Sequence, residues 1–370
     1  MTKPGRTRVI PSTRAVAPLI ALLIAGGTAA CGTDAGTGTQ ASGDGTCAGE
    51  TVNVGINNSG SDAPILIADE KGYFSDAGLE VELIEFKSGG QMVPAIGSGQ
   101  IDAGAGSPGA GLYNAIGGGL DIRIVADKAT MVPGHAYMPL MVRKDLVDSG
   151  QVQGVGDLRG LTVAQSSEGS TASATLGAIL GTAGLAYEDV TLESLGFPEH
   201  VAALQNGSVD ASLLVEPFAT VAEEQGAAVR FFDPSEVYSG QQVAVLLYNG
   251  AFAGEGAAAT CFMEAYLRGA RDYYKAVEPG SWTGENAEAL SELIAQRIGL
   301  DVELYRKAVP HYVDPNGEVQ VESLKRDYEF FQQHGWIEAD ADVNVEELVD
   351  PSFADSVVQK LGEIETDAIG

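Results

Sequence analysis

The sequence predicts an α/β fold of two lobes, each a mixed sheet flanked by helices, joined by a two-segment hinge. One element occurs twice: A-I-G-S-G-Q-I-D-A at residues 95–103 returns as A-L-Q-N-G-S-V-D-A at residues 203–211. Each copy predicts a short helix, a glycine stop and a strand that opens on Asp-Ala. Around both copies, expected strands alternate with expected helices, which favours mainly parallel pairing. Two such lobes imply an intervening cleft, where small ligands bind.

The strand and helix patterns place the lobes along the chain. In the first lobe, we expect strands at 51–56, 80–86, 101–106 and 122–126, with helices starting at Pro64, Ser88 and Ser107-Pro108. In the second, we expect strands at 137–142, 161–165, 190–195 and 211–215, and helices at 170–184, 198–204 and 216–225, after a polar connection at 144–160. A strand at 242–248 returns to the first lobe, and helices follow at 261–277, 285–298, 302–309, 323–334 and 352–361. The predicted lobes are residues 51–136 with 243–370, and residues 137–242, with hinge segments at 138–143 and 242–247.

The charge of the chain limits its partners. The 370 residues carry a formal net charge of −30. The acidic residues are dispersed, with a modest cluster at 338–350, which is typical of a solvated surface. Such acidity argues against binding to nucleic acid and against adsorption to anionic lipid.

The first 31 residues have the pattern of an export signal. Residues 1–14 contain four basic side chains and no acid, residues 16–25 are apolar, and Thr28-Ala29-Ala30 precedes Cys31. A charged region, a short apolar region and small residues at a cleavage site are typical of a secretory signal peptide. The apolar run is too short for a membrane span. We therefore expect residues 1–31 to direct the protein out of the cytoplasm.

Cys31 resembles the cysteine of a bacterial lipobox, which becomes the lipidated first residue. Thr28 stands where leucine is usual, so an ordinary secretory signal remains the alternative. Residues 32–50 follow as a flexible tether, rich in Gly, Thr, Ala, Asp and Ser. The expectation is a protein anchored to the outer face of the cell membrane through Cys31.

Two further cysteines, Cys47 and Cys261, form an even pair. In an oxidising compartment such a pair suggests a disulfide. It would tie the start of the first lobe to a late segment, while two buried thiols are the alternative.

Five sequence pieces occur in a family order between about Val52 and Val277. They are I-A-D-E-K-G-Y-F-S-D-A-G-L-E-V, A-I-G-S-G-Q-I-D-A, D-L-R-G-L-T-V-A, A-L-Q-N-G-S-V-D-A and L-V-E-P-F-A. Together they resemble the substrate-binding proteins of ABC importers, in the subfamily for sulfonates, nitrate and thiamine-pyrimidine precursors. The resemblance implies a type II periplasmic-binding fold that catches a small molecule between its lobes. It also implies delivery to a membrane permease and its ATPase by a monomer without cofactor or metal.

Four loops follow expected strands and are candidates for the ligand site. In open α/β sheets, ligands lie beyond the carboxyl ends of strands, near helix N-termini. The candidate ligand-binding residues in these loops are Asn58, Ser59, Asp62, Ser88, Gly89, Gln91, Ser107, Pro108, Ser166, Ser167, Ser170 and Thr171. The alternative for each loop is simple helix capping by Ser, Asp or Asn.

Two more candidates lie outside these loops. Glu216, in L-V-E-P-F, also ends a strand, where it can contact ligand or cap the following helix. Tyr137, like Tyr113 and Phe197, can stack on a flat ligand or pack in the core or hinge.

The charges in the loops bear on the ligand. Helix N-termini and serine-rich loops favour anions such as sulfonate or carboxylate. None of the four loops contains Lys or Arg, whereas Asp62 and Glu168 lie in them and Glu216 lies at an equivalent strand end. The sequence therefore favours a neutral, partly cationic or zwitterionic compound, pyrimidine-like or flavin-like, over a bare divalent oxyanion. A sulfonate-like ligand also fits the helix N-termini.

Two other classes of function were compared with transport. The same group includes a pyrimidine-precursor synthase with a Cys-rich iron-binding motif, but this chain has three distant cysteines and four histidines without metal-ligand spacing. It also lacks the nucleophile-elbow and phosphate-loop motifs, so we expect no enzymatic activity. A ligand-sensing partner of a membrane receptor remains the second alternative.

Overall fold

The structure is a computed structural model that describes residues 47, 49–87, 89–341 and 343–366. The predicted signal peptide, most of the tether and the proposed lipidation at Cys31 lie outside the described residues. All elements below belong to one compact unit, Asp44–Gly370. No helix in the described part is long and apolar enough to span a membrane.

The first sheet has the strand order β2-β1-β3-β10-β4. Its strands are β1 (Glu50–Ile56), β2 (Leu79–Glu85), β3 (Ala103–Gly106), β4 (Ile122–Met131) and β10 (Gln241–Asn249). The first three pair in parallel, whereas β10 runs antiparallel between β3 and β4. The helices between them are α1 (Ala63–Glu70), α2 (Tyr73–Asp76), α3 (Gly89–Gly97) and α4 (Ala110–Gly117). We call this sheet with its helices, including the C-terminal ones, the first lobe.

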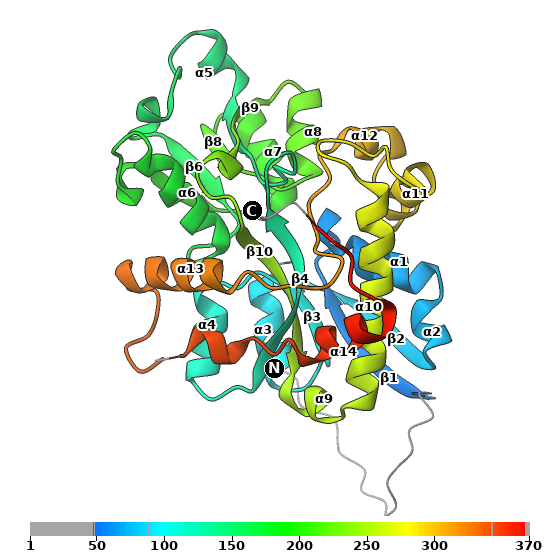
Figure 1. Ribbon diagram of the computed structural model, residues 1–370. Coiled ribbons are helices and arrows are strands. Elements are labelled where there is room, and N and C mark those ends of the chain that lie inside the picture. The colour runs from blue at the N-terminus through cyan, green and yellow to red at the C-terminus, as the bar shows by residue number, and fades with distance from the viewer. Residues whose placement is uncertain (1–46, 48, 88, 342, 367–370) are drawn as a thin grey trace, which may run out of the picture. The chain divides into compact units, whose positions relative to one another are not determined.

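The second sheet has the order β7-β6-β8-β5-β9. Its strands are β5 (Leu140–Arg143), β6 (Thr162–Gln165), β7 (Thr191–Ser194), β8 (Ala211–Leu213) and β9 (Ala228–Phe232). Strands β6, β7 and β8 pair in parallel, and β5 is antiparallel to β8 and β9. Its helices are α5 (Lys144–Asp148), α6 (Thr171–Gly181), α7 (Phe197–Asn206) and α8 (Phe218–Glu224). Residues 140–232 with these elements form the second lobe, which lies above the first in Figure 1.

The predicted α/β class with two mixed sheets is confirmed. Sequence patterns missed β9, and the connection at 144–160 contains α5 and a short 3-10 helix. The segments that link the sheets are residues 132–139 and 233–240, so both predicted hinge segments consist largely of sheet residues. The predicted lobe boundaries and the hinge bending stay predictions.

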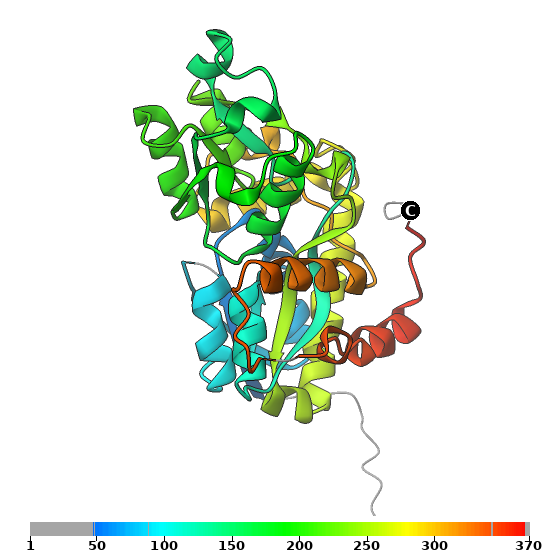
Figure 2. The same cartoon turned by 90° about the vertical axis from the view of Figure 1, so that its left-hand side faces the viewer.

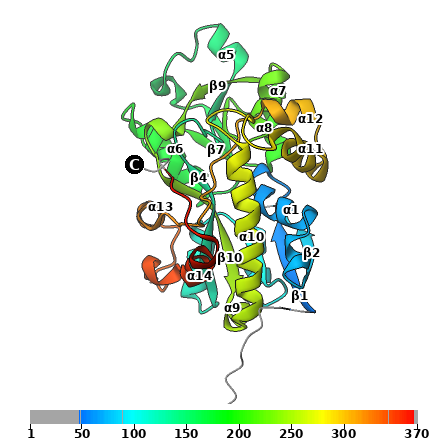
Figure 3. The ribbon, with the colours of Figure 1, turned by 45° about the vertical axis from the view of Figure 1, so that its right-hand side comes forward.

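The C-terminal part is helical, as expected. It contains α9 (Gly250–Gly254), α10 (Ala257–Ala276), α11 (Ala287–Ile298), α12 (Val302–Lys307), α13 (Val321–Gln333) and α14 (Ser352–Leu361). The described part of the chain also contains 3-10 turns at Gly60–Asp62, Val155–Leu158, Tyr187–Asp189, Pro234–Glu236 and Val345–Leu348. Figures 2 and 3 show α13 lying across β4 and β10, and α10 running beside α1.

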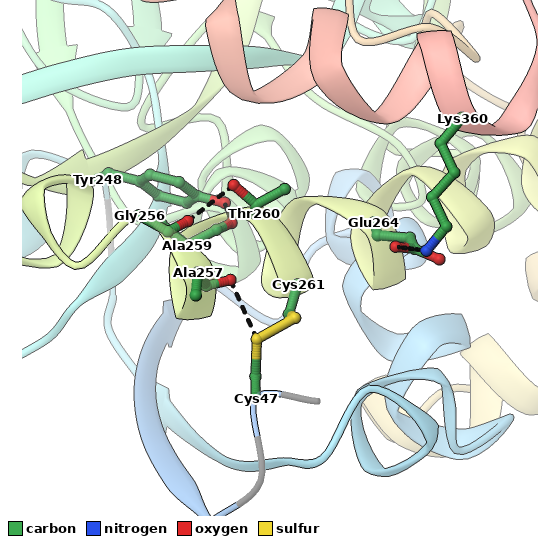
Figure 4. Close-up of a disulfide and its surroundings, with 9 residues drawn as sticks. All are labelled: Cys47, Tyr248, Gly256, Ala257, Ala259, Thr260, Cys261, Glu264 and Lys360. Atoms are coloured by element: carbon green, nitrogen blue, oxygen red, sulfur yellow. Dashed lines mark hydrogen bonds and ion pairs between the residues drawn. A yellow bond between two sulfur atoms is a disulfide. The ribbon is translucent and has the colours of Figure 1, made fainter. Parts of the chain in front are cut away.

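A disulfide links helix α10 to the start of the first lobe. Cys47 and Cys261 form the predicted disulfide, across 214 positions of sequence (Figure 4). Further along, a Cβ on Gly269 would lie 2.1 Å from the carbonyl oxygen of Pro64, so only glycine allows α10 to approach α1 this closely.

Buried polar side chains tie the C-terminal part to the long strands β4 and β10. Asp127 of β4 accepts a hydrogen bond from the amide of Asp314 at 2.7 Å. On β10, the Gln241 side chain donates to Asp327 of α13 at 3.1 Å and accepts from Thr175 of the second-lobe helix α6 at 2.6 Å. The side chains of Asp127, Thr175, Gln241 and Asp327 are fully buried, and Asp314 is 2% exposed. The contacts join α13 and both lobes through one strand.

Candidate functional site

A cavity lies between the two sheets. Its lining comes from the residues that follow β1, β2, β3, β6, β7 and β8, from the linking residues Tyr137 and Met138, and from β4 and β10. The carboxyl ends of parallel strands from both sheets thus meet at this cavity, which is the place where α/β sheets bind ligands.

Most of the predicted site residues line this cavity. Those that do are Ser59, Gly89, Ser107, Tyr137, Ser166, Ser167, Ser170 and Thr171. Asn58, Asp62, Gln91, Pro108 and Glu216 do not line it, and Ser88 lies outside the described residues. Contact of any of them with ligand stays a prediction.

Asp62 shapes the loop that follows β1. One carboxylate oxygen accepts hydrogen bonds from the backbone amides of Asn57 and Ser59, each at 3.0 Å. The other oxygen lies 2.9 Å from Lys128 Nζ. Asp62 is fully buried, and its carboxylate interacts with the amides of the loop and with one cation, Lys128. The loop in turn presents Asn57, Ser59 and Ser61 to the cavity.

Lys128 is the functional candidate that sequence reasoning missed. Its side chain is 1% exposed, lines the cavity, donates to Ser61 Oγ at 2.7 Å and forms an ion pair with Asp62. A buried lysine is expensive unless it is paired, because the ammonium loses its hydration. The expected strand at 122–126 stops before Asp127 and Lys128, whereas β4 continues to Met131 and includes both. Nothing in the local sequence indicates that Lys128 reaches the cavity.

Lys87, an exposed residue, lines the same cavity just before α3. The structure therefore brings two cations to the site from outside the four predicted loops. Among the described residues, no Asp or Glu side chain lines this cavity. With Lys128 balanced by Asp62, the lining carries an excess of positive charge, in contrast to the sequence-based expectation.

Two helix N-termini add to the positive electrostatic potential of the cavity. Helix α3 begins at Gly89, and α6 begins at Thr171 behind its N-cap Ser170, and these three residues line the cavity. Helix N-termini carry free amide hydrogens and a partial positive charge, which favours an anionic group.

The two lobes touch at one side of the cavity. Ser107 Oγ and Thr171 Oγ1 are 3.1 Å apart, and the Ala110 amide donates to the Gly169 carbonyl at 2.7 Å. A Cβ on Gly109 would lie 2.6 Å from that carbonyl oxygen, so glycine permits the approach. Serine and threonine hydroxyls from both lobes thus face one space.

The remaining lining is mainly apolar. Besides Gly90, Gly106 and Gly196, it consists of Tyr137, Met138, Ala172, Leu195, Phe197, Val215, Val243 and Ala244. The hydroxyl of Tyr137 forms a hydrogen bond with Ser61. The cavity therefore offers a polar, positively charged part and an apolar part, which suits an organic molecule with one charged group.

Glu216 has a structural position. It is 3% exposed, forms an ion pair with Arg230, and accepts hydrogen bonds from the backbone amide and hydroxyl of Thr220 at 3.1 and 2.9 Å. The bond to the Thr220 amide satisfies the first turn of α8, which is the capping alternative. It also accepts from the amide of Val309 at 3.3 Å. Burial raises the pKa of its carboxyl group, and Arg230 opposes that shift.

Comparison with known proteins places this site in a family. The family model described as NMT1/THI5 like matches residues 60–278, more than half of the chain. The chain belongs to the NMT1/THI5-like family. The match includes the end of the loop after β1, from Gly60, the second-lobe serines and the strand that bears Lys128.

Individual relatives agree with this placement. A protein of Bacillus subtilis (strain 168), named as binding aliphatic sulfonates, is 27% identical over 179 residues; the match covers 46% of this chain and 49% of that protein. The matched region thus spans about half the length of that relative.

Solved structures share the fold. The alkanesulfonate-binding protein of Xanthomonas axonopodis pv. citri, bound to MOPS, is 19% identical with a TM-score of 0.65, over 82% of this chain and 99% of that one. The periplasmic nitrate-binding protein of Synechocystis PCC 6803 is 14% identical with a TM-score of 0.71, over 86% and 91%. The desulfurization enzyme DszB also matches, at 16% identity and a TM-score of 0.57, over 84% and 99%. These likenesses establish the fold, which serves binding proteins and at least one enzyme.

Proposed function

We propose that the protein is the substrate-binding component of an ABC importer and that it captures a small organic anion between its lobes. The observation that carries the proposal is Lys128, a buried ammonium group that faces the cavity near the N-termini of two helices. Lys128, the helix dipoles and the Ser and Thr hydroxyls would hold the charged group of the ligand. The apolar wall would hold its body.

The proposal favours a sulfonate-like or carboxylate-like ligand over the pyrimidine-like or flavin-like compound that the loops alone suggested. Asp62 already balances one charge, so a singly charged ligand fits better than a divalent oxyanion. The names of the relatives, which refer to sulfonates and nitrate, support an anionic ligand.

The proposed mechanism is reversible binding, in which the ligand is not changed chemically. Ligand would bind one lobe, the segments at 132–139 and 233–240 would bend, and the second lobe would cover it. Among the described cavity residues there is no Cys or His to act as nucleophile or base. An enzymatic role is the weaker candidate, favoured only by the shared fold of DszB.

Delivery requires a position outside the cytoplasm, next to a permease and its ATPase. The signal-like residues 1–31 and the tether support this location, and Cys31 supports a lipid anchor. The Cys31→Ser variant should leave the membrane fraction, and unchanged membrane retention would refute the anchor.

A thermal-shift screen tests the ligand class. Aliphatic sulfonates, carboxylates, nitrate, pyrimidines, flavins and amino acids would each be added to the purified protein. A ligand at 100 times its Kd stabilises the folded state by about 2.7 kcal/mol. We expect the largest rise in melting temperature with organic monoanions. A rise confined to pyrimidines or flavins would overturn the proposed ligand class.

A further inference from the structure

Helix α13 belongs to the C-terminal part of the first lobe, yet it packs against α6 of the second lobe (Figure 1). Gly177 of α6 lies at this contact. A Cβ on Gly177 would lie 2.5 Å from Cε2 and 2.7 Å from Cζ of Phe330, in α13. The Phe330 ring thus occupies the space that a larger residue would need, and glycine permits the two lobes to meet here.

Other rings hold the ring of Phe330 in place. Its centroid lies 5.7 Å from that of Tyr187, in the second lobe, and 4.1 Å from that of His334, which follows α13. Trp336 completes the cluster, at 5.4 Å from Tyr187 and 5.9 Å from Phe330. Aromatic pairs at these distances pack with specific geometry. With these neighbours, the Phe330 ring has little room to turn away from α6.

In the first lobe, the aromatic cluster is tied to α4. The Asn114 side chain donates to the carbonyl of Trp336 and accepts from the amide of Glu338, both at 2.9 Å. Tyr113, in the same helix, packs edge-on against Tyr328 of α13, with ring centroids 5.0 Å apart. These contacts fix α13 relative to α4, which follows the cavity-lining end of β3.

In the second lobe, the cluster is connected to the wall of the ligand cavity. The Tyr187 hydroxyl accepts from Gln165 Nε2 at 2.9 Å, and Gln165 Oε1 accepts from Ser173 of α6 at 2.8 Å. All three side chains are buried. Gln165 directly precedes Ser166, and α6 begins at Thr171, and these last two residues line the cavity. The contact with α13 therefore bears on the elements that present second-lobe hydroxyls to the ligand.

We propose that Phe330 and Gly177 form an interlobe clamp that positions the N-terminus of α6 at the ligand cavity. Neither residue lines the cavity, so both are positioning residues that act through α6. The clamp sets the fraction of molecules in which the hydroxyls of both lobes face one space. The apparent Kd for ligand rises as this fraction falls. The effect on Kd rests on the proposed function, whereas the clamp itself can be tested without ligand.

Hydrogen exchange at the Ala110 amide measures the contact between the lobes in the ligand-free protein. This amide donates to the Gly169 carbonyl across the lobes, and as the first residue of α4 it has no partner within its own helix. Gly177→Ala crowds the Phe330 ring, so exchange at Ala110 should become at least about fivefold faster. Gly181→Ala is the matched control in the same helix, because a Cβ there meets nothing within 4 Å, and it should leave the exchange unchanged. Unchanged exchange in Gly177→Ala, or an equal change in both variants, would overturn the clamp.

Variants of Phe330 test the same contact from the side of α13. Phe330→Ala removes the ring instead of crowding it, and exchange at Ala110 should again be faster than in the wild type. Gly177→Ala/Phe330→Leu pairs the added methyl group with a smaller side chain, so exchange should return toward the wild-type rate. A double variant that exchanges as fast as Gly177→Ala would show that the two residues do not form one contact.

Calorimetry on the same variants tests the effect on binding. Affinity for an alkanesulfonate should fall at least about fivefold in Gly177→Ala and stay unchanged in Gly181→Ala. Faster exchange in Gly177→Ala combined with wild-type affinity would refute the positioning role. Failure of the wild type to bind any organic anion would instead refute the proposed function, and the exchange rates would then decide the clamp by themselves.

Discussion

Both copies of the repeated element form a helix, a glycine turn and a strand, but the residues that follow the two strands differ in chemical character. Asp102, after α3, accepts a hydrogen bond from the amide of Asn53 at 2.8 Å. Asp210, after α7, accepts one from the amide of Thr162 at 3.0 Å. Each Asp thus joins its strand to the neighbouring parallel strand, within β1 in the first copy and at the first residue of β6 in the second. A glycine with positive φ precedes each, Gly99 at 70° and Gly207 at 76°.

Beyond the repeat, the strands diverge. Strand β3 leads to Ser107 at the ligand cavity, whereas β8 leads to Glu216, which pairs with Arg230 and does not line that cavity. Both cavity cations, Lys87 and Lys128, belong to the first lobe, and the second lobe contributes hydroxyls and apolar groups. The repeat therefore builds the scaffold of both lobes, while residues outside it determine what each lobe binds.

The largest expected effect concerns the disulfide, which fastens the first lobe and has no counterpart described in the second. In the chain-entropy model, closing a loop of this length stabilises the folded state by roughly 5 kcal/mol. The double variant Cys47→Ala/Cys261→Ala should lose stability up to that amount in urea unfolding. If the lobes unfold in separate steps, the loss should fall on the first lobe alone. An equal loss in both steps would break this distinction between the lobes.

Lys128→Met tests whether the first lobe supplies the charge that binds ligand. Removing one partner of a buried ion pair costs about 3–5 kcal/mol, because Asp62 is left unpaired. Affinity for an organic anion should fall about tenfold to 100-fold in calorimetry, since a hydrogen bond to a charged group is lost.

The matched control separates these two losses. Adding Asp62→Asn to Lys128→Met removes the unpaired charge, so stability should recover in part while affinity stays low. Wild-type affinity in the stable double variant would show that Lys128 does not contact the ligand.

Asp327, in α13, contacts the second lobe through Gln241. Its titration predicts that the stability of the fold depends on pH. Burial raises the pKa of Asp327 to about 7, against an ordinary value near 4. A carboxyl group whose folded-state pKa is raised favours folding while it is protonated, and this contribution is lost as pH rises from about 4 to 7. Between pH 5 and 8 the free energy of unfolding should fall by about 2–3 kcal/mol from this group.

Asp327→Asn, which cannot ionise, should flatten that decline. Urea unfolding of both proteins at pH 5 and pH 8 checks the difference. Equal slopes would mean that Asp327 is ionised across the whole range.

The smallest effect compares the two repeats directly. Asp102→Ala and Asp210→Ala each leave one backbone amide without its acceptor, so each should cost about 1–2 kcal/mol. Asp210 also pairs with the partly exposed Arg143, at 3.2 Å, which adds little. Chemical unfolding of both variants measures the costs. A severalfold difference between them would show that the copies do not share one role.

Much of the scaffold was predictable from the sequence because it depends on local patterns. The alternation of strands and helices, the glycine stops and the duplicated Asp-Ala element determined the α/β class and the two mixed sheets. Strand β9 was missed since A-V-R-F-F lacks alternation and lies at a sheet edge. Helix α4 begins at Ala110, after the predicted Ser107-Pro108, because the chain first extends toward the second lobe.

The site was predictable only in part. Loops after parallel strands were recognisable, and the hydroxyls of Ser107 and Thr171 do meet across the cavity. Which charges enter the cavity depends on tertiary pairing. Asp62 lies in a predicted loop, but its carboxylate accepts hydrogen bonds from the backbone of that loop and does not line the cavity. Lys128 lies in the middle of a strand, and its side chain lines the cavity. No local pattern indicates either outcome.

The most direct test of the account is a calorimetric titration of the purified protein with an aliphatic sulfonate, followed by mass spectrometry of the recovered ligand. The account predicts saturable binding of one ligand per chain and recovery of the ligand with its mass unchanged. Absence of binding for every organic anion tried, or steady conversion of a bound one, would contradict it.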